Sequence, residues 1–67
     1  MNLREELEKI CREFQRIANQ AREDRLILTE ATAVTHLGNL ARDIALENES
    51  CYPQIYERYK HALEITK

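Results

Sequence analysis

The stretch from Leu3 to Ala21, LREELEKICREFQRIANQA, decides the fold. Apolar residues recur in it at alternating intervals of four and three, and Cys11 and Ala18 widen one side of the pattern. The recurring residues are Leu3, Leu7, Ile10, Phe14, Ile17 and Ala21. At about 100° per residue, they cover roughly a third of a helix circumference, and the other positions are charged or amide. The pattern predicts an amphipathic helix that needs apolar partners.

The chain is short for a stable fold. Its 67 residues make one helical domain, residues 1–67. A chain of this size buries only about 60% of its unfolded surface, so disulfides, a metal or oligomerisation commonly add stability. Cys11 and Cys51 do not cluster with histidines at metal-ligand spacing, and the polar N-terminus lacks the apolar segment of a secretory signal. We therefore expect a cytoplasmic protein with free thiols, no metal and no cofactor, which gains stability by oligomerisation.

The composition points to an all-α fold. Lys and Arg number 10 and Asp and Glu number 12, which gives a net charge of −2. No basic patch stands out, so a nucleic-acid partner is not expected. The longest apolar run, Leu26-Ile27-Leu28, is far too short to span a membrane. One glycine and one proline leave little room for the tight turns of a sheet.

Three helices are expected, over about residues 3–24, 30–47 and 53–65, joined by short linkers. Asn2 is placed to cap the first helix, Thr29 the second and Ser50 the third. If the first helix continued, Leu26 would point off its apolar side, so a break is expected near Arg25. The result is a three-helix bundle with antiparallel neighbours.

The second helix has apolar residues over nearly half of its circumference. Bulky residues form one part of this face, and small residues form a flank beside it. The bulky residues are Val34, Leu37, Leu40 and Ile44, and the small ones are Ala31, Gly38, Ala41 and Ala45. So broad a face can contact two neighbours, which places this helix between the other two. Gly38 costs about 1 kcal/mol relative to Ala inside a helix, and close approach of another backbone would explain it.

Leftover apolar residues favour a homodimer that completes the bundle. Leu26, Ile27, Leu46 and Ile65 lie near linkers or ends, where they form either isolated exposed residues, as is normal on a surface, or one patch. We expect a two-fold dimer in which the first helix meets its copy. The predicted interface comprises Leu3, Leu7, Ile10, Phe14 and Ile17, with Tyr52, Tyr56 and Tyr59 on the third helix as a further face. The tyrosines form either a platform for a partner protein or a packing face.

No residue pattern points to catalysis. His36 and His61 fall on the polar faces of their helices, and no nucleophilic residue lies at a sequence spacing from either that would suggest a catalytic pair. The carboxylates are matched by basic residues one turn away, as on a solvated helix surface. Cys11 is expected in the core and Cys51 at the surface. We expect no enzyme, and no catalytic, cofactor-binding or metal-binding residues.

A helix-turn-helix is the alternative for the middle of the chain. If the second helix were split at Gly38, Asn39 could cap a short helix that presents Arg42, Asp43 and Glu47 to DNA. Recognition helices usually carry Arg, Lys, Asn or Gln at such positions, so two acids and one Arg are unfavourable. A dimeric DNA-binding transcriptional regulator is therefore the second functional hypothesis.

The stretch from Leu37 to Ile65 resembles a tetratricopeptide-type helical hairpin. The resemblance rests on Leu37-Gly38 in the first helix and on Tyr59 followed by Ala62-Leu63-Glu64 in the second. The linker is longer than the family's, and Ala41 stands where the family prefers Tyr. The resemblance implies protein binding through a helical surface.

These observations favour a small, non-enzymatic protein–protein interaction module. Such a module would be an adaptor, an inhibitor, or an immunity or antitoxin-like regulator that docks on a partner protein. Its acidic middle region would face that partner, so that association weakens with salt.

Overall fold

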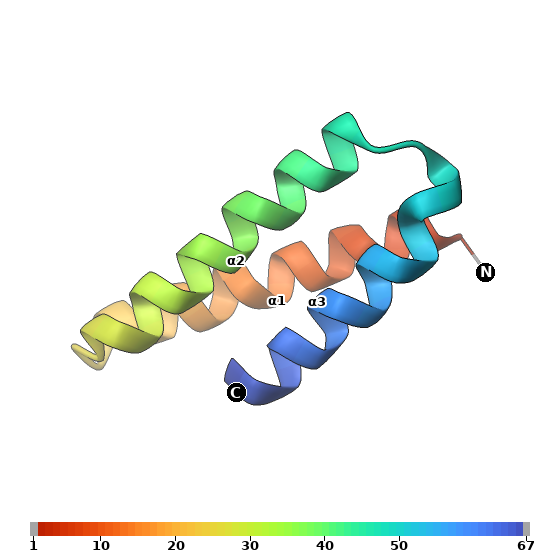
Figure 1. Ribbon diagram of the computed structural model, residues 1–67. Coiled ribbons are helices and arrows are strands. Elements are labelled where there is room, and N and C mark those ends of the chain that lie inside the picture. Colours follow the sequence, from red (N-terminus) through yellow and green to blue (C-terminus); the bar gives the residue numbers. More distant parts are fainter. Residues whose placement is uncertain (1, 67) are drawn as a thin grey trace.

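The computed structural model describes residues 2–66. It contains helix α1 (Leu3–Glu23), helix α2 (Ile27–Leu46), the short 3-10 turn η1 (Glu49–Cys51) and helix α3 (Tyr52–Thr66). Successive helices run antiparallel and pack side by side (Figure 1). This arrangement confirms the expected all-α three-helix bundle. Among the described residues, no helix combines the length and apolarity that crossing a membrane requires.

The ends of α1 lie where the sequence predicts them. The Asn2 side-chain oxygen accepts hydrogen bonds from the backbone N–H groups of Arg4 at 3.0 Å and Glu5 at 3.4 Å. At the other end, Arg25 has a left-handed backbone with φ of 59°. The N–H of Leu26 then donates to the carbonyl of Ala21 at 2.8 Å. This bond closes the helix end and turns the chain sharply, so α2 returns along α1.

The starts of α2 and of the last helical segment differ from the prediction. Helix α2 begins at Ile27, so Thr29 lies inside it and Leu26 takes the cap position without a side-chain hydrogen bond. The tight closure of α1 leaves no room for the longer linker that was expected. At η1 the cap is Asn48, whose side chain accepts from the Ser50 N–H at 3.1 Å, so Ser50 is not the cap.

Helix α1, rather than α2, supplies the largest share of the core. Its buried residues are Leu7, Ile10, Phe14, Ala18 and Ala21, whereas those of α2 are Ala33 and Leu40. Helix α1 packs against both other helices. Helix α2 also packs against α3, so each helix contacts the other two and none lies between its neighbours, contrary to the prediction for α2. The reason is that α2 turns Val34 and its small residues outward, whereas the apolar side of α1 faces inward along its whole length.

Candidate functional site

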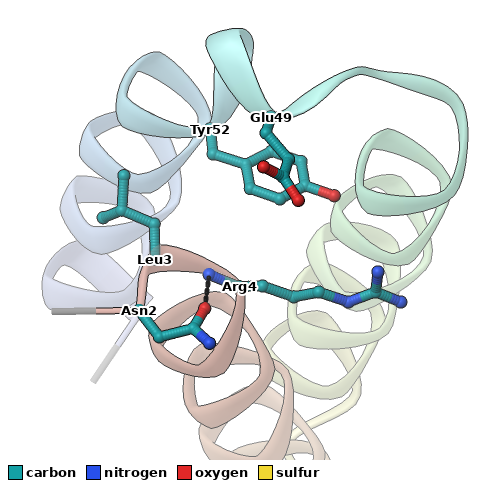
Figure 2. A pocket seen from close by; sticks show the side chains of 5 residues that line it. All are labelled: Asn2, Leu3, Arg4, Glu49 and Tyr52. Atoms are coloured by element: carbon teal, nitrogen blue, oxygen red, sulfur yellow. Dashed lines mark hydrogen bonds between the residues drawn. The ribbon is translucent and has the colours of Figure 1, made fainter.

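A hollow lies where the first turn of α1 faces η1 and the start of α3. Figure 2 shows its lining residues, Asn2, Leu3, Arg4, Glu49 and Tyr52. Several of its polar groups already have partners inside the chain. The Asn2 side chain caps α1, Arg4 Nε lies 3.5 Å from Glu8 Oε1, and the Tyr52 hydroxyl donates to the Ile44 carbonyl at 3.3 Å. The lining brings together no nucleophile and base in the geometry that covalent catalysis requires.

His36 is not on a polar face, contrary to the prediction. Its ring is half-buried, with its centroid 5.4 Å from that of Phe14 and 6.5 Å from that of Tyr59. It therefore packs on the inner side of α2, while His61 is exposed. Within residues 2–66, no three His, Cys, Asp or Glu side chains gather closely enough to hold a metal ion.

Two of the three tyrosines fasten α3 to α2. Tyr52 and Tyr59 are buried, and the Tyr59 hydroxyl donates to Asp43 Oδ2 at 2.9 Å. Burial, together with this hydrogen bond, raises the pKa of Tyr59 above its ordinary value. Tyr56 is half-buried, and Lys60 Nζ lies 5.6 Å from its ring centroid. Of the two readings of the tyrosine face, packing describes Tyr52 and Tyr59.

Both cysteines are half-buried and free. Burial raises the pKa of Cys11, and the neighbouring Glu8 carboxylate adds to the effect. A raised pKa lowers the thiolate fraction, so Cys11 is a weak nucleophile. Cys51 packs partly against the core, so the expectation of a surface position is wrong. The reason is that η1 folds this segment back onto the bundle.

The predicted interface residues of α1 are covered within the single chain. Leu7, Ile10 and Phe14 are 0%, 6% and 0% exposed, and Leu3 and Ile17 are half-buried against the same core. The other two helices together supply the apolar surface that α1 needs. The reason for pairing through α1, an uncovered apolar strip, therefore does not hold.

The exposed apolar residues do not form one patch. Leu26, Ile27, Leu46 and Ile65 are exposed, as expected. However, Leu46 ends α2 and Ile27 begins it, so about 28 Å of helix, at 1.5 Å per residue, separates them. Ile65 lies beside Leu28 on the wall of a shallow hollow, at the same end of the bundle as Leu26 and Ile27, so it is Leu46 that lies apart from the other three.

Helix α2 is continuous through Gly38. It runs from Ile27 to Leu46 as one α-helix, without the break that a helix-turn-helix would require at Gly38 and Asn39. The short second helix that would carry Arg42 into a DNA groove does not form.

The side of α2 that points away from both other helices is nearly uncharged. This surface, here called the outer face of α2, consists of Ile27, Ala31, Val34, Gly38, Ala41 and Ala45, all of them exposed. Their intervals are four, three, four, three and four, so they form a straight seam along the helix. Throughout α2, every residue of which is described, Arg42 is the single charged residue at an exposed position. No helix of the bundle covers this side of α2 (Figure 1).

The exposed positions of α1 provide a contrast. Each of them carries a charged or amide side chain, as a solvated helix surface should. Sequence reasoning placed Ala31, Gly38, Ala41 and Ala45 on a flank of α2 but assigned that flank to packing inside the chain. The absence of charge from the flank was the signal that identifies it as a candidate binding surface.

Gly38 lies in the middle of the outer face without a neighbour. A Cβ atom built there would meet nothing within 4 Å. The expected approach of another backbone to Gly38 therefore does not occur within the chain. The helix carries the cost of a glycine, about 1 kcal/mol relative to Ala, with no packing inside the chain to explain it.

The fold places the protein in the broad class of all-α three-helix bundles. No known protein family matches the chain, and no curated protein or solved structure is significantly similar to it.

Proposed function

We propose that this protein is a small, non-enzymatic interaction module that binds an apolar helix of another polypeptide chain on the outer face of α2. The observation that carries the proposal is the near absence of charge along that exposed face. In a chain that is 33% charged, a solvated helix side would be expected to carry several charges. A helix side that faces water normally carries charged residues, so an exposed side with almost none is suited to a partner.

The apolar content of the face supports the same reading. Ile27 is 75% exposed and Val34 is 51% exposed, and both lie on the seam. Leu28, which is 84% exposed, and Leu46, which is 75% exposed, lie to one side of it. Exposed apolar residues aligned along one side of a helix are typical of interaction sites in soluble proteins. The small residues between them allow a second helix to come close, which favours a helix as the ligand.

The module would serve as an adaptor, an inhibitor, or an immunity or antitoxin-like regulator. The resemblance of the segment from Leu37 to Ile65 to a tetratricopeptide-type hairpin points the same way, because such hairpins bind proteins. We place the protein in the cytoplasm, a proposal supported by its two free cysteines. The binding surface proposed here replaces α1, whose apolar side is already covered.

The test is position-specific photo-crosslinking in the cells that make the protein. A benzophenone amino acid replaces Thr35, which is exposed beside the outer face, and, as a matched control, Gln15, which is exposed on α1. A polypeptide crosslinked from position 35 and not from position 15 is the expected result. Equal crosslinking from both positions, or none from position 35, would show that the outer face of α2 is not a binding surface.

A further inference from the structure

The geometry of α2 points to a specific occupant: we infer that a second copy of this chain binds there, with its own α2 antiparallel and the two-fold axis level with His36. The inference rests on the proposed function, because it names the chain that covers the outer face. It also replaces the expected pairing through α1 by a pairing through α2.

The seam is symmetric about the level of His36. Each of its residues lies as many positions before His36 as a counterpart lies after it. The counterparts are Ile27 with Ala45, Ala31 with Ala41, and Val34 with Gly38. In an antiparallel pair with its axis at His36, counterparts from the two copies therefore meet at the same height. The seam intervals of four and three suit two helices packed at about 20° to each other.

The counterparts are complementary in size. Ile27 of one copy meets Ala45 of the other, and Val34 meets Gly38, so each bulky residue faces a small one. Pairing a bulky residue with a small one lets the two helices pack closely at these levels. The open space above Gly38, where a Cβ would touch nothing within 4 Å, becomes the position that receives Val34 of the second copy. The glycine then has the packing role that it lacks in the single chain.

A parallel pair fits the same residues poorly. Its two-fold axis runs along the helices, so each residue meets its own copy: Val34 would face Val34 and Gly38 would face Gly38. The bulky residues would then hold the helices apart at one level and leave a gap at the next, which costs packing energy.

Charge favours the antiparallel arrangement as well. Arg42 is the charged residue exposed on α2. In the antiparallel pair the two Arg42 residues lie twelve positions apart along the seam, about 18 Å at 1.5 Å per residue. This distance exceeds the Debye length of about 8 Å at physiological ionic strength, so their repulsion is screened. A parallel pair would place them at the same level. The exposed side of α1, by contrast, carries charged and amide side chains throughout, which makes it unsuitable for apolar pairing with its copy.

The size of the contact sets the expected affinity. A helix of 20 residues is about 30 Å long and about 10 Å wide, so the footprint is about 300 Å² on each copy. Standard specific interfaces bury about 800 Å² of each partner. The dimer should therefore be weak, with a dissociation constant of about 10 µM or more.

The first test is sedimentation equilibrium of the whole chain from about 1 to 300 µM, the range in which a micromolar dimer forms. Ala41→Glu adds a charge at the seam and should raise the dissociation constant at least tenfold. Gln15→Glu adds the same charge on the exposed side of α1 and should leave the constant unchanged. A wild-type chain that stays monomeric throughout this range overturns the inference, as does a dimer that Ala41→Glu does not weaken.

The second test exchanges a bulky and a small residue of the seam to determine how the two α2 helices are aligned. Gly38→Val places two valines against each other in the antiparallel pair and should weaken the dimer at least tenfold. Adding Val34→Gly restores a valine facing a glycine, so the double variant should recover most of the affinity. In a parallel pair Gly38→Val would fill a gap and strengthen the dimer, which would overturn the inference. Circular dichroism at low concentration, where the chain is monomeric, checks that each variant is folded.

The photo-crosslinking experiment separates this inference from the proposed function. If the polypeptide crosslinked from position 35 is a second copy of the chain, both stand. If it is a different protein and the purified chain is monomeric, the proposed function stands and the choice of a second copy is wrong.

Discussion

Gly38→Ala should stabilise the single chain. A Cβ at position 38 meets nothing within 4 Å, so the substitution has no steric cost, and Ala gains about 1 kcal/mol over Gly in a helix interior. With about 2.1 cal/mol/K per residue, the 67 residues give an unfolding entropy of about 140 cal/mol/K. A gain of 1 kcal/mol therefore raises the Tm by about 7 °C.

Thermal unfolding followed by circular dichroism measures this gain at about 2 µM, below the micromolar dissociation constant expected for the dimer. Ala41→Gly is the matched control, because it makes the reverse change at another exposed seam position and should lower the Tm by a similar amount. If Gly38 receives Val34 of a second copy, the advantage of Gly38→Ala should also shrink as the concentration rises. A lower Tm for Gly38→Ala at 2 µM would refute the reasoning, since it would mean that the space above Gly38 is filled within one chain.

Three further predictions concern the core, the Tyr59 hydroxyl and DNA. Phe14→Ala removes a ring that is 0% exposed and should lower the free energy of unfolding by about 3–5 kcal/mol, as measured by urea titration. Tyr59→Phe removes the hydrogen bond to Asp43 and should cost about 0.5–1.5 kcal/mol at neutral pH. Because the folded pKa of Tyr59 is raised, its contribution is complete below the unfolded value of 10.0 and is lost as the pH rises through the folded pKa. Above pH 10.0, the free energy of unfolding from urea titrations should thus fall more steeply with pH for wild type than for Tyr59→Phe. An equal fall for both would contradict a raised pKa of Tyr59. Duplex DNA should not be retarded by the protein in an electrophoretic assay at moderate salt, because Arg42 is the single charged residue that α2 exposes to a DNA groove. A sequence-dependent shift would favour the DNA-binding alternative.

The three helices could be predicted because their signals are local. The seam of α1, the Asn2 cap and the break at Arg25 each depend on neighbouring residues, and the structure places them as expected. The start of α2 was missed because Thr29 is a good capping residue and Leu26 is a poor one. The closure of α1, in which the Leu26 N–H reaches the Ala21 carbonyl, outweighs that preference. The Asn48 cap was missed for a different reason, because a short 3-10 turn has no strong sequence signal.

The packing of the helices could not be predicted to the same extent, because it depends on which side of each helix faces a neighbour. His36 has polar residues near it in sequence, yet it lies against Phe14 and Tyr59. The sequence left open whether Tyr52 belongs to a binding platform or to a packing face, and its hydrogen bond to the Ile44 carbonyl fits the second. A helical wheel gives the angle between residues but not the direction in which the helix faces.

The seams of α1 and α2 show where this ambiguity matters for function. Both repeat at intervals of four and three, and this spacing alone is equally compatible with packing inside a chain and packing between chains. What separates them is the opposite side of each helix. Outside its apolar seam, helix α1 carries charged or amide side chains, so its apolar surface lies on one side and is buried there. Helix α2 buries Ala33 and Leu40 on one side, and on its exposed side Arg42 is the single charged residue. One helix therefore completes the core of the single chain, and the other has a second, nearly uncharged side that we propose another chain covers.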